Sequence, residues 1–172
     1  MHIRSAKPDD AGRICKIYSY YVENTAITFE IDVPSPDELK ERITRTLKRY
    51  PYLVLEDNGR IEGYAYAGVF YDRAAYDHSC EVTIYIDRKS HGKGYGRLLY
   101  EELEKELKKR GIINLYACIA DPVVEDEYLT SSSEKFHAHL GYVKNGEFHK
   151  CGYKFGRWYN MIWMEKIIGE HR

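Results

Sequence analysis

The segment that most constrains the fold is a predicted strand, a glycine-rich turn and a predicted helix in direct succession. The strand covers residues 79–87, and the turn contains the alternate glycines Gly92, Gly94 and Gly96. Glycine lets the backbone approach an anion closely, and a helix N-terminus carries about half a positive charge. We therefore predict that this turn binds a pyrophosphate, with Lys93 and Arg97 as charged donors. A plain tight turn is the alternative, since the spacing fits neither a Rossmann motif nor a P-loop.

The remaining elements are predicted from hydrophobic periodicity and from capping and turn residues. We expect a short strand around Ile3, a helix from Asp9 or Asp10 to Val22, and an irregular stretch over 24–34. A further helix follows, which Ser35 caps and in which Glu38 is placed for a capping box. A hairpin over 52–69 turns at Asn58-Gly59, which suits a primed turn. The glycines are followed by a predicted long helix with an apolar stripe of Leu99, Leu103 and Leu107, which Gly111 ends. After it we expect a strand over 114–120, a short helix that Gly141 ends, and strands over 152–155 and 159–166. This order predicts an α/β (α+β) fold, a mixed sheet flanked by helices, in one domain over residues 1–172.

Composition limits the partners of the chain. Twenty-six basic and 27 acidic side chains give a formal net charge of -1, so no basic excess indicates nucleic-acid or membrane-surface binding. No apolar run is long enough to cross a membrane, and the first residues do not resemble a signal peptide. The four cysteines are far apart in sequence, which argues against a metal site and favours reduced core cysteines. We expect a soluble, cytoplasmic protein without a metal.

A resemblance to a known family is carried by several segments. His91-Gly92-Lys93-Gly94-Tyr95-Gly96 resembles the acetyl-CoA motif of GNAT N-acetyltransferases, usually [Q/R]-x-x-G-x-[G/A]. The stretches TAITFEI, GYAYAGVFYDRAAYDHSCEVTIYI, EKFHAHLGY and CGYKFGRWYN extend the similarity to the phosphinothricin and methionine sulfone/sulfoximine acetyltransferase group. The resemblance implies a mostly antiparallel GNAT fold, acetyl-CoA as co-substrate, direct attack of an amine on the thioester, and a homodimer. The number of large apolar side chains in GYKFGRWYNMIWM also favours a dimer.

The resemblance assigns the cofactor site by position. It places pantetheine along residues 84–86 and the pyrophosphate on residues 92–97, with Thr130 where relatives have an Asn that contacts CoA. The implied cofactor-binding residues are Ile84, Tyr85, Ile86, Gly92, Lys93, Gly94, Tyr95, Gly96, Arg97 and Thr130. His91 and Gly92 depart from the family pattern, so the cradle depends more on backbone amides and Lys93.

Two proton transfers need residues. Glu81 matches the proposed base of the family, and the apolar residues beside it would raise the pKa of a carboxylate there. His137 lies where many relatives have a Tyr and is the predicted proton donor to the leaving thiolate, although a lone His in an apolar helix is more often structural. Tyr142 is another candidate donor.

An acceptor that is an amino acid needs a partner for its carboxylate. Arg73 matches the substrate-side Arg of the family and can bind a carboxylate through two parallel hydrogen bonds. The implied substrate-binding residues are Phe29, Tyr71, Asp72, Arg73, Tyr76, Glu81, Val82 and Thr83. The residues Glu125, Asp126 and Glu127 read as a solvated acidic turn, with a border of the substrate entrance as the alternative.

The sequence thus predicts an acetyl-CoA-dependent N-acetyltransferase for a small amino acid or amino-acid analogue. Acetylation of a protein or peptide amine is the first alternative. A module that binds acetyl-CoA as a regulatory ligand without turnover is the second.

Overall fold

The computed structural model describes residues 1–172 and is built on one seven-stranded sheet in the order β1-β2-β3-β4-β5-β7-β6. The strands are β1 (His2–Ser5), β2 (Tyr52–Asp57), β3 (Arg60–Val69), β4 (Ser79–Ile86), β5 (Asn114–Asp121), β6 (Val143–Lys154) and β7 (Arg157–Ile167). The helices are α1 (Ala11–Asn24), α2 (Pro36–Leu47), α3 (Tyr95–Lys109) and α4 (Ser132–His139). Every strand pair is antiparallel except β4 with β5. The predicted mixed, mostly antiparallel sheet flanked by helices is confirmed.

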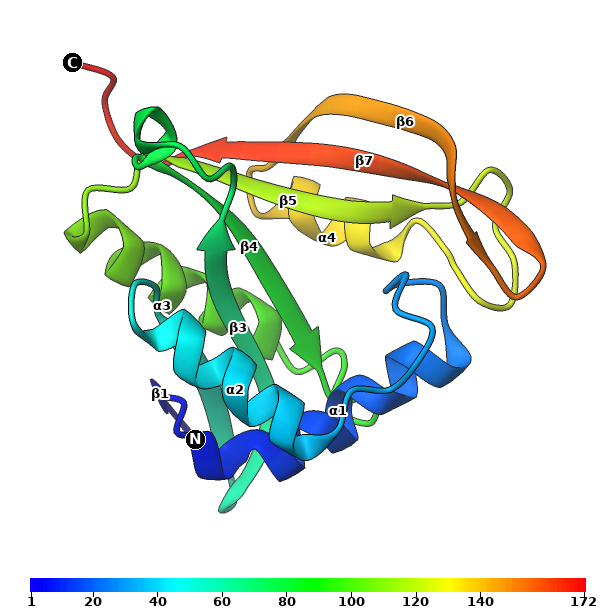
Figure 1. Cartoon of the computed structure of the whole chain (residues 1–172), viewed down its shortest axis with the longest axis horizontal. Coiled ribbons are helices and arrows are strands. Elements are labelled where there is room, and N and C mark those ends of the chain that lie inside the picture. The colour runs from blue at the N-terminus through cyan, green and yellow to red at the C-terminus, as the bar shows by residue number, and fades with distance from the viewer.

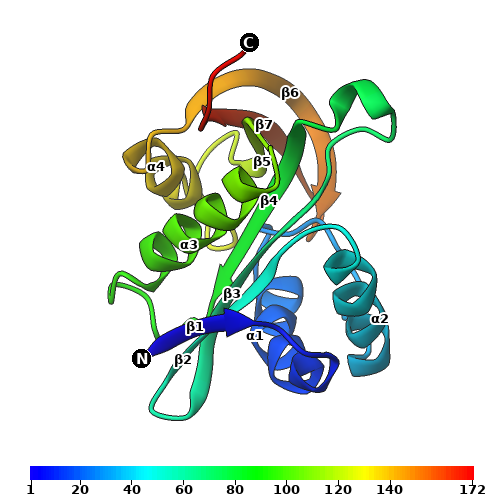
Figure 2. The ribbon, with the colours of Figure 1, turned by 90° about the vertical axis from the view of Figure 1, so that its left-hand side faces the viewer.

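The helices lie on opposite faces of the sheet, with α1 and α2 on one face and α3 and α4 on the other (Figures 1 and 2). Successive strand residues point to opposite faces, so two separate cores form. The larger core joins α3 to β2–β5 and β7, and Leu99, Leu103 and Leu107 are fully buried in it. The smaller core joins α1 and α2 to β2 and β3. The predicted apolar stripe of α3 is therefore confirmed.

Local turn and cap residues act as predicted at several boundaries. Asn58 and Gly59 both have positive φ, as a type I′ hairpin turn requires. Ser35 Oγ accepts the Glu38 N–H at the start of α2. The Glu38 carboxylate, which the sequence placed in a capping box, instead accepts a hydrogen bond from Arg42.

The last hairpin is where the sequence prediction was wrong. β6 begins at Val143 and not near residue 152, so the strand is much longer than predicted. It is an edge strand, exposed at most positions before Gly152, with register shifts between Lys144 and Gly146 and between Phe148 and Gly152. An exposed, irregular strand has no alternation of apolar and polar residues, so periodicity does not reveal it. A further correction concerns the cysteines, because Cys118 and Cys151 are exposed and only Cys15 and Cys80 are buried.

Candidate active site

The site forms where β4 and β5 separate. These parallel strands pair only from Ser79–Glu81 to Asn114–Tyr116. Beyond that point β4 continues along β3 and β5 continues along β7, so the two strands diverge (Figure 1). Residues 82–86 of β4 therefore have one edge without a strand partner. Backbone N–H and C=O groups at such an edge are free to bind an extended ligand.

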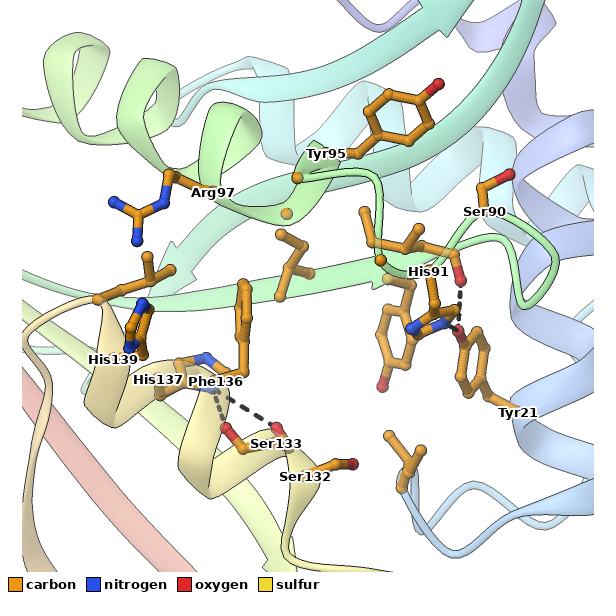
Figure 3. Close-up of a pocket in the computed structure, with 18 residues that line it drawn as sticks. Tyr21, Ser90, His91, Tyr95, Arg97, Ser132, Ser133, Phe136, His137 and His139 are labelled. Carbon is orange, nitrogen blue, oxygen red and sulfur yellow. Dashed lines mark hydrogen bonds between the residues drawn. The ribbon is translucent and has the colours of Figure 1, made fainter.

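Two cavities lie along this opening. The large cavity, about 430 Å³, is lined by the end of β4, the glycine turn, the start of α3 and one side of α4 (Figure 3). The small cavity, about 50 Å³, is lined by β4 and β5, including Val82, Thr83 and Cys118. Ile84, Tyr85 and His137 line both cavities, so the two share a wall.

The glycine turn has the backbone that the sequence predicts. Gly92 and Gly94 both have φ +80°, and a Cβ on either would meet no atom within 4 Å. Gly94 is the N-cap residue of α3, so the free N–H groups of the first helical turn face this open space. Gly96 is needed for a different reason than the predicted anion approach. A Cβ there would lie 2.8 Å from Cζ of Phe136, so Gly96 lets α4 pack closely against α3.

Buried polar contacts hold the start of this turn. The buried Asp87 carboxylate accepts the Lys89 N–H at 2.9 Å and hydrogen bonds from Arg13 at 2.6 Å and Arg60 at 3.0 Å. Burial alone would raise the pKa of Asp87, but these donors outweigh it and the pKa lies below its usual value. At the other end, Tyr95 Oη donates to Asp57 at 2.5 Å. The turn is therefore fixed to α1 and to the β2–β3 hairpin.

Most residues predicted to bind the cofactor line the large cavity, and two do not. Those that do are Ile84, Tyr85, Ile86, Gly92, Gly94, Tyr95, Gly96 and Arg97. Lys93 Nζ lies 5.8 Å from the ring centre of Tyr95, and Thr130 Oγ1 accepts the Ser132 N–H. The sequence analysis missed Tyr21, Ser132 and Ser133, which line the cavity from α1 and α4. The two serines open a predicted helix, a signal that could have identified them.

Glu81 is the last residue of β4 that pairs with β5, and the two strands separate after it. Its side chain forms no hydrogen bond or ion pair within the chain and is partly buried. Burial raises the pKa of Glu81 above its usual value. A carboxylate with a raised pKa and free oxygens is suited to accept a proton.

His137 is buried, and both ring nitrogens have partners. Nδ1 lies 2.8 Å from the Ser133 carbonyl and Nε2 lies 2.9 Å from Tyr100 Oη. A carbonyl only accepts, so Nδ1 carries the hydrogen and Nε2 accepts from Tyr100. Burial lowers the pKa of His137 to about 4, which keeps the ring neutral at physiological pH. The predicted donor role of His137 therefore requires one of these hydrogen bonds to break first.

Tyr142, the other candidate donor, has a buried hydroxyl without a hydrogen-bond partner. Its ring packs against Tyr100 and His137, and it lines neither cavity.

The predicted substrate loop lies at the Glu81 end of β4. Tyr71, Asp72, Arg73 and Tyr76 are all exposed, and Arg73 forms no side-chain hydrogen bond or ion pair. Tyr71 and Tyr76 pack with Phe70. The Phe70 ring stacks on the Tyr116 ring, with 4.3 Å between the ring centres. None of these four residues lines the two cavities, and their loop precedes the end of β4 that is paired with β5.

Phe29 is held on the other side of the opening by the last hairpin. A Cβ on Gly152 would lie 2.4 Å from the Phe29 ring, so only glycine permits this contact. The buried Lys154 ammonium donates to the Thr28 carbonyl at 2.8 Å. Gly152 and Lys154 thus fix the loop that carries Phe29.

The predicted solvated acidic turn holds for Glu125 and Glu127, which are exposed, but is wrong for Asp126, which is partly buried. The Asp126 carboxylate accepts the N–H groups of Tyr128 and Leu129, and hydrogen bonds from Tyr159 at 2.8 Å and Arg157 at 3.1 Å. Because one carboxylate joins its own loop to β7, the loop is part of the folded structure.

Comparison with known proteins decides the family. The GNAT acetyltransferase domain matches residues 3–163. This protein belongs to the GNAT acetyltransferase family. It is 32% identical over 161 residues to phosphinothricin N-acetyltransferase of Streptomyces viridochromogenes, covering 94% of this chain and 84% of the relative. It is 31% identical over 172 residues to the L-methionine sulfoximine/L-methionine sulfone acetyltransferase of Salmonella typhimurium, covering 99% and 96%.

A solved structure is similar over nearly the whole length. The phosphinothricin acetyltransferase of Sinorhizobium meliloti, solved in complex with acetyl-CoA, superposes with a TM-score of 0.88 at 32% identity, covering 98% of this chain and 88% of that one. In this GNAT protein no helix is long and apolar enough to cross a membrane. No cluster of three or more His, Cys, Asp or Glu side chains could hold a metal ion.

The state of His137 predicts how stability changes with pH. The imidazole is neutral in the folded protein down to about pH 4 but takes a proton near 6.5 when unfolded. Its contribution is therefore present above pH 6.5 and lost as the pH falls toward 4, by about 3 kcal/mol in total. Urea unfolding at pH 7.5 and pH 4.5 should show a smaller loss of stability in His137→Gln than in the wild type. The exposed His139→Gln is the control and should follow the wild type.

Proposed function

We propose that this GNAT protein transfers the acetyl group of acetyl-CoA to the primary amine of a small amino acid or amino-acid analogue. The observation that carries the proposal is the unpaired edge of β4 between the glycine turn at one end and Glu81 at the other. The relatives named for phosphinothricin and for methionine sulfoximine or sulfone support this class of acceptor.

The large cavity fits CoA in shape and chemistry. Gly92 and Gly94 leave open space beside the free N–H groups of α3, which suits a pyrophosphate. The unpaired backbone of residues 84–86 suits the amides of pantetheine, and Arg97 adds a cation at the cavity wall. Bound acetyl-CoA supplies the activated acetyl thioester. The protein holds it beside the acceptor, which accounts for much of the expected rate enhancement.

Glu81 is the proposed general base. An ammonium must lose a proton before it attacks, and Glu81 has free oxygens at the point where the strands separate. We assign this first proton transfer to Glu81 and not to His137, whose ring nitrogens are both occupied.

The glycine turn gives the first test. Gly94→Ala places a side chain at φ +80° in the turn, and Gly59→Ala does the same at φ +73° in the remote β2–β3 turn. Both should lower stability by about 1 kcal/mol because L residues resist this backbone conformation. Isothermal titration should show weakened CoA binding in Gly94→Ala alone. Equal CoA affinity in the two variants would contradict the pyrophosphate site.

The base is tested by pH–rate profiles. Glu81→Gln should lower kcat about 100- to 10,000-fold near neutral pH, with a smaller loss at high pH where more amine is already free. In the wild type the rate should fall as the pH drops through the raised pKa of Glu81. Glu165→Gln is a matched control, since Glu165 is also partly buried and lies on β7, two strands away from β4 in the sheet. A Glu81→Gln profile identical to the wild type would make Glu81 structural.

We propose that Arg73 binds the acceptor carboxylate, and the acceptor screen tests this together with the reaction. Mass spectrometry of a mixture of amino acids, their α-amides and a short peptide with acetyl-CoA should show acetylation of free acids first. Arg73→Ala should raise KM for an acid about ten- to 150-fold, the effect of a charge-assisted contact, and leave the amide unchanged. Arg73→Lys should recover part of the loss. Preference for the peptide would favour the protein-amine alternative, and absence of any product would favour the regulatory module.

We propose that the protein is a cytoplasmic homodimer. The exposed aromatic side chains of the β6–β7 hairpin support self-association. Trp158 and Tyr153 are each 57% exposed, and their ring centres are 4.7 Å apart. Phe148 is 53% exposed. Four free cysteines are consistent with a reducing compartment. Light scattering should give twice the chain mass, and Trp158→Arg should lower it. A wild-type mass equal to one chain would refute the dimer.

A further inference from the structure

His91 begins the glycine turn at the position where the family pattern has Gln or Arg. Its Nε2 lies 2.8 Å from Tyr21 Oη on α1. The same hydroxyl also contacts the Ile86 carbonyl at the end of β4 (Figure 3). The imidazole is therefore held against α1 by one ring nitrogen.

These contacts assign the hydrogens. The Ile86 carbonyl can only accept, so the Tyr21 hydroxyl donates its single hydrogen there. Tyr21 Oη must then accept from His91, which places a hydrogen on Nε2. Nδ1 has no partner within the chain.

The free nitrogen belongs to a residue that lines the large cavity, next to Gly92 and Gly94. In neutral His91, Nδ1 carries a lone pair and repels phosphate oxygens. After protonation it becomes a second donor with a positive charge. Gln or Arg can donate at any physiological pH, whereas an imidazole changes state between about pH 5 and pH 8.

Most of the other charged groups around the glycine turn already have partners. Asp87 is occupied by Arg13, Arg60 and the Lys89 N–H. Arg88 lies over the Tyr20 ring on α1, and on α3 the Arg97 guanidinium is 3.9 Å from Glu101. The remaining charge in the turn is Lys93, beside Tyr95.

Two further imidazoles line the cavity from α4. Burial keeps His137 neutral, with its pKa lowered to about 4. His139 is exposed and lines the same cavity, so it is the other imidazole that needs a control.

We propose that protonated His91 is a phosphate ligand of CoA in this protein, so that binding takes up a proton and tightens as the pH falls. The inference rests on the proposed use of acetyl-CoA. The sign follows from linkage, because a bound phosphate favours the charged imidazole and affinity is lost as the pH rises through its titration. A charge-assisted contact at an exposed site corresponds to about a three- to tenfold change in affinity.

Isothermal titration of CoA at pH 6 and pH 8 tests the proposal in the wild type and in His91→Gln, His91→Arg and His139→Gln. From pH 8 to pH 6 the wild type and His139→Gln should gain about three- to tenfold more affinity than His91→Gln, which keeps a donor but does not titrate. His91→Arg should bind tightly at both pH values without this extra gain. Repeating the titration in buffers of different ionisation enthalpy should show more proton uptake in the wild type than in His91→Gln.

Comparison with His91→Gln removes the contribution of the titrating phosphate of CoA itself. Pantetheine, which lacks the phosphates, should show no difference between the wild type and His91→Gln. Equal gains for CoA in the wild type and His91→Gln would overturn the proposal, as would a gain lost in His139→Gln or a difference that persists with pantetheine. Absence of CoA binding in every variant at both pH values would instead overturn the proposed function.

Discussion

The separation of β4 from β5 after only three paired residues is the constraint on which the site depends. Hydrogen bonds between Ser79–Glu81 and Asn114–Tyr116 fix where the strands meet, and no ladder joins them beyond that point. An unpaired backbone inside a sheet is costly unless something else binds it. The structure stabilises the two arms separately, β4 through β3 and β5 through β7, and so keeps the gap open. Glu81 is at the vertex of this gap and the glycine turn is at its far end.

The two arms of the sheet differ in what covers them. The N-terminal arm is β1–β4, and the C-terminal arm is β5, β7 and β6. Fully buried Leu99, Leu103 and Leu107 place α3 in the core that it shares with β2–β5 and β7 on one face of the sheet. On the other face α1 and α2 cover only the N-terminal arm (Figure 2). The aromatic residues Phe148, Tyr153 and Trp158 of the C-terminal arm are exposed. The N-terminal arm therefore carries the glycine turn and its anchors. The loop with Tyr71, Asp72, Arg73 and Tyr76 also belongs to this arm, since it joins β3 to β4.

Contacts between distant segments turn this frame into a specific site. Tyr21 joins α1 to both Ile86 and His91, and Asp87 joins Arg13 to the start of the glycine turn. Across the gap, Gly152 and Lys154 hold the segment with Thr28 and Phe29. These contacts link residues more than 60 positions apart in the sequence.

The sequence by itself determined the elements whose signals are local. The Asn58-Gly59 turn, the Ser35 cap, the leucine stripe of α3 and the positive-φ glycines follow from backbone sterics and period, which act over a few residues. Most of the long, irregular β6 was not predicted, because an exposed edge strand has no alternation of apolar and polar residues to detect. Only the tertiary structure decided that His137 is neutral with both nitrogens occupied, that Asp126 is anchored to β7, and that His91 is oriented by Tyr21. Those properties depend on burial and on partners from remote segments, and desolvation and hydrogen bonding of a side chain are set only when the chain has folded.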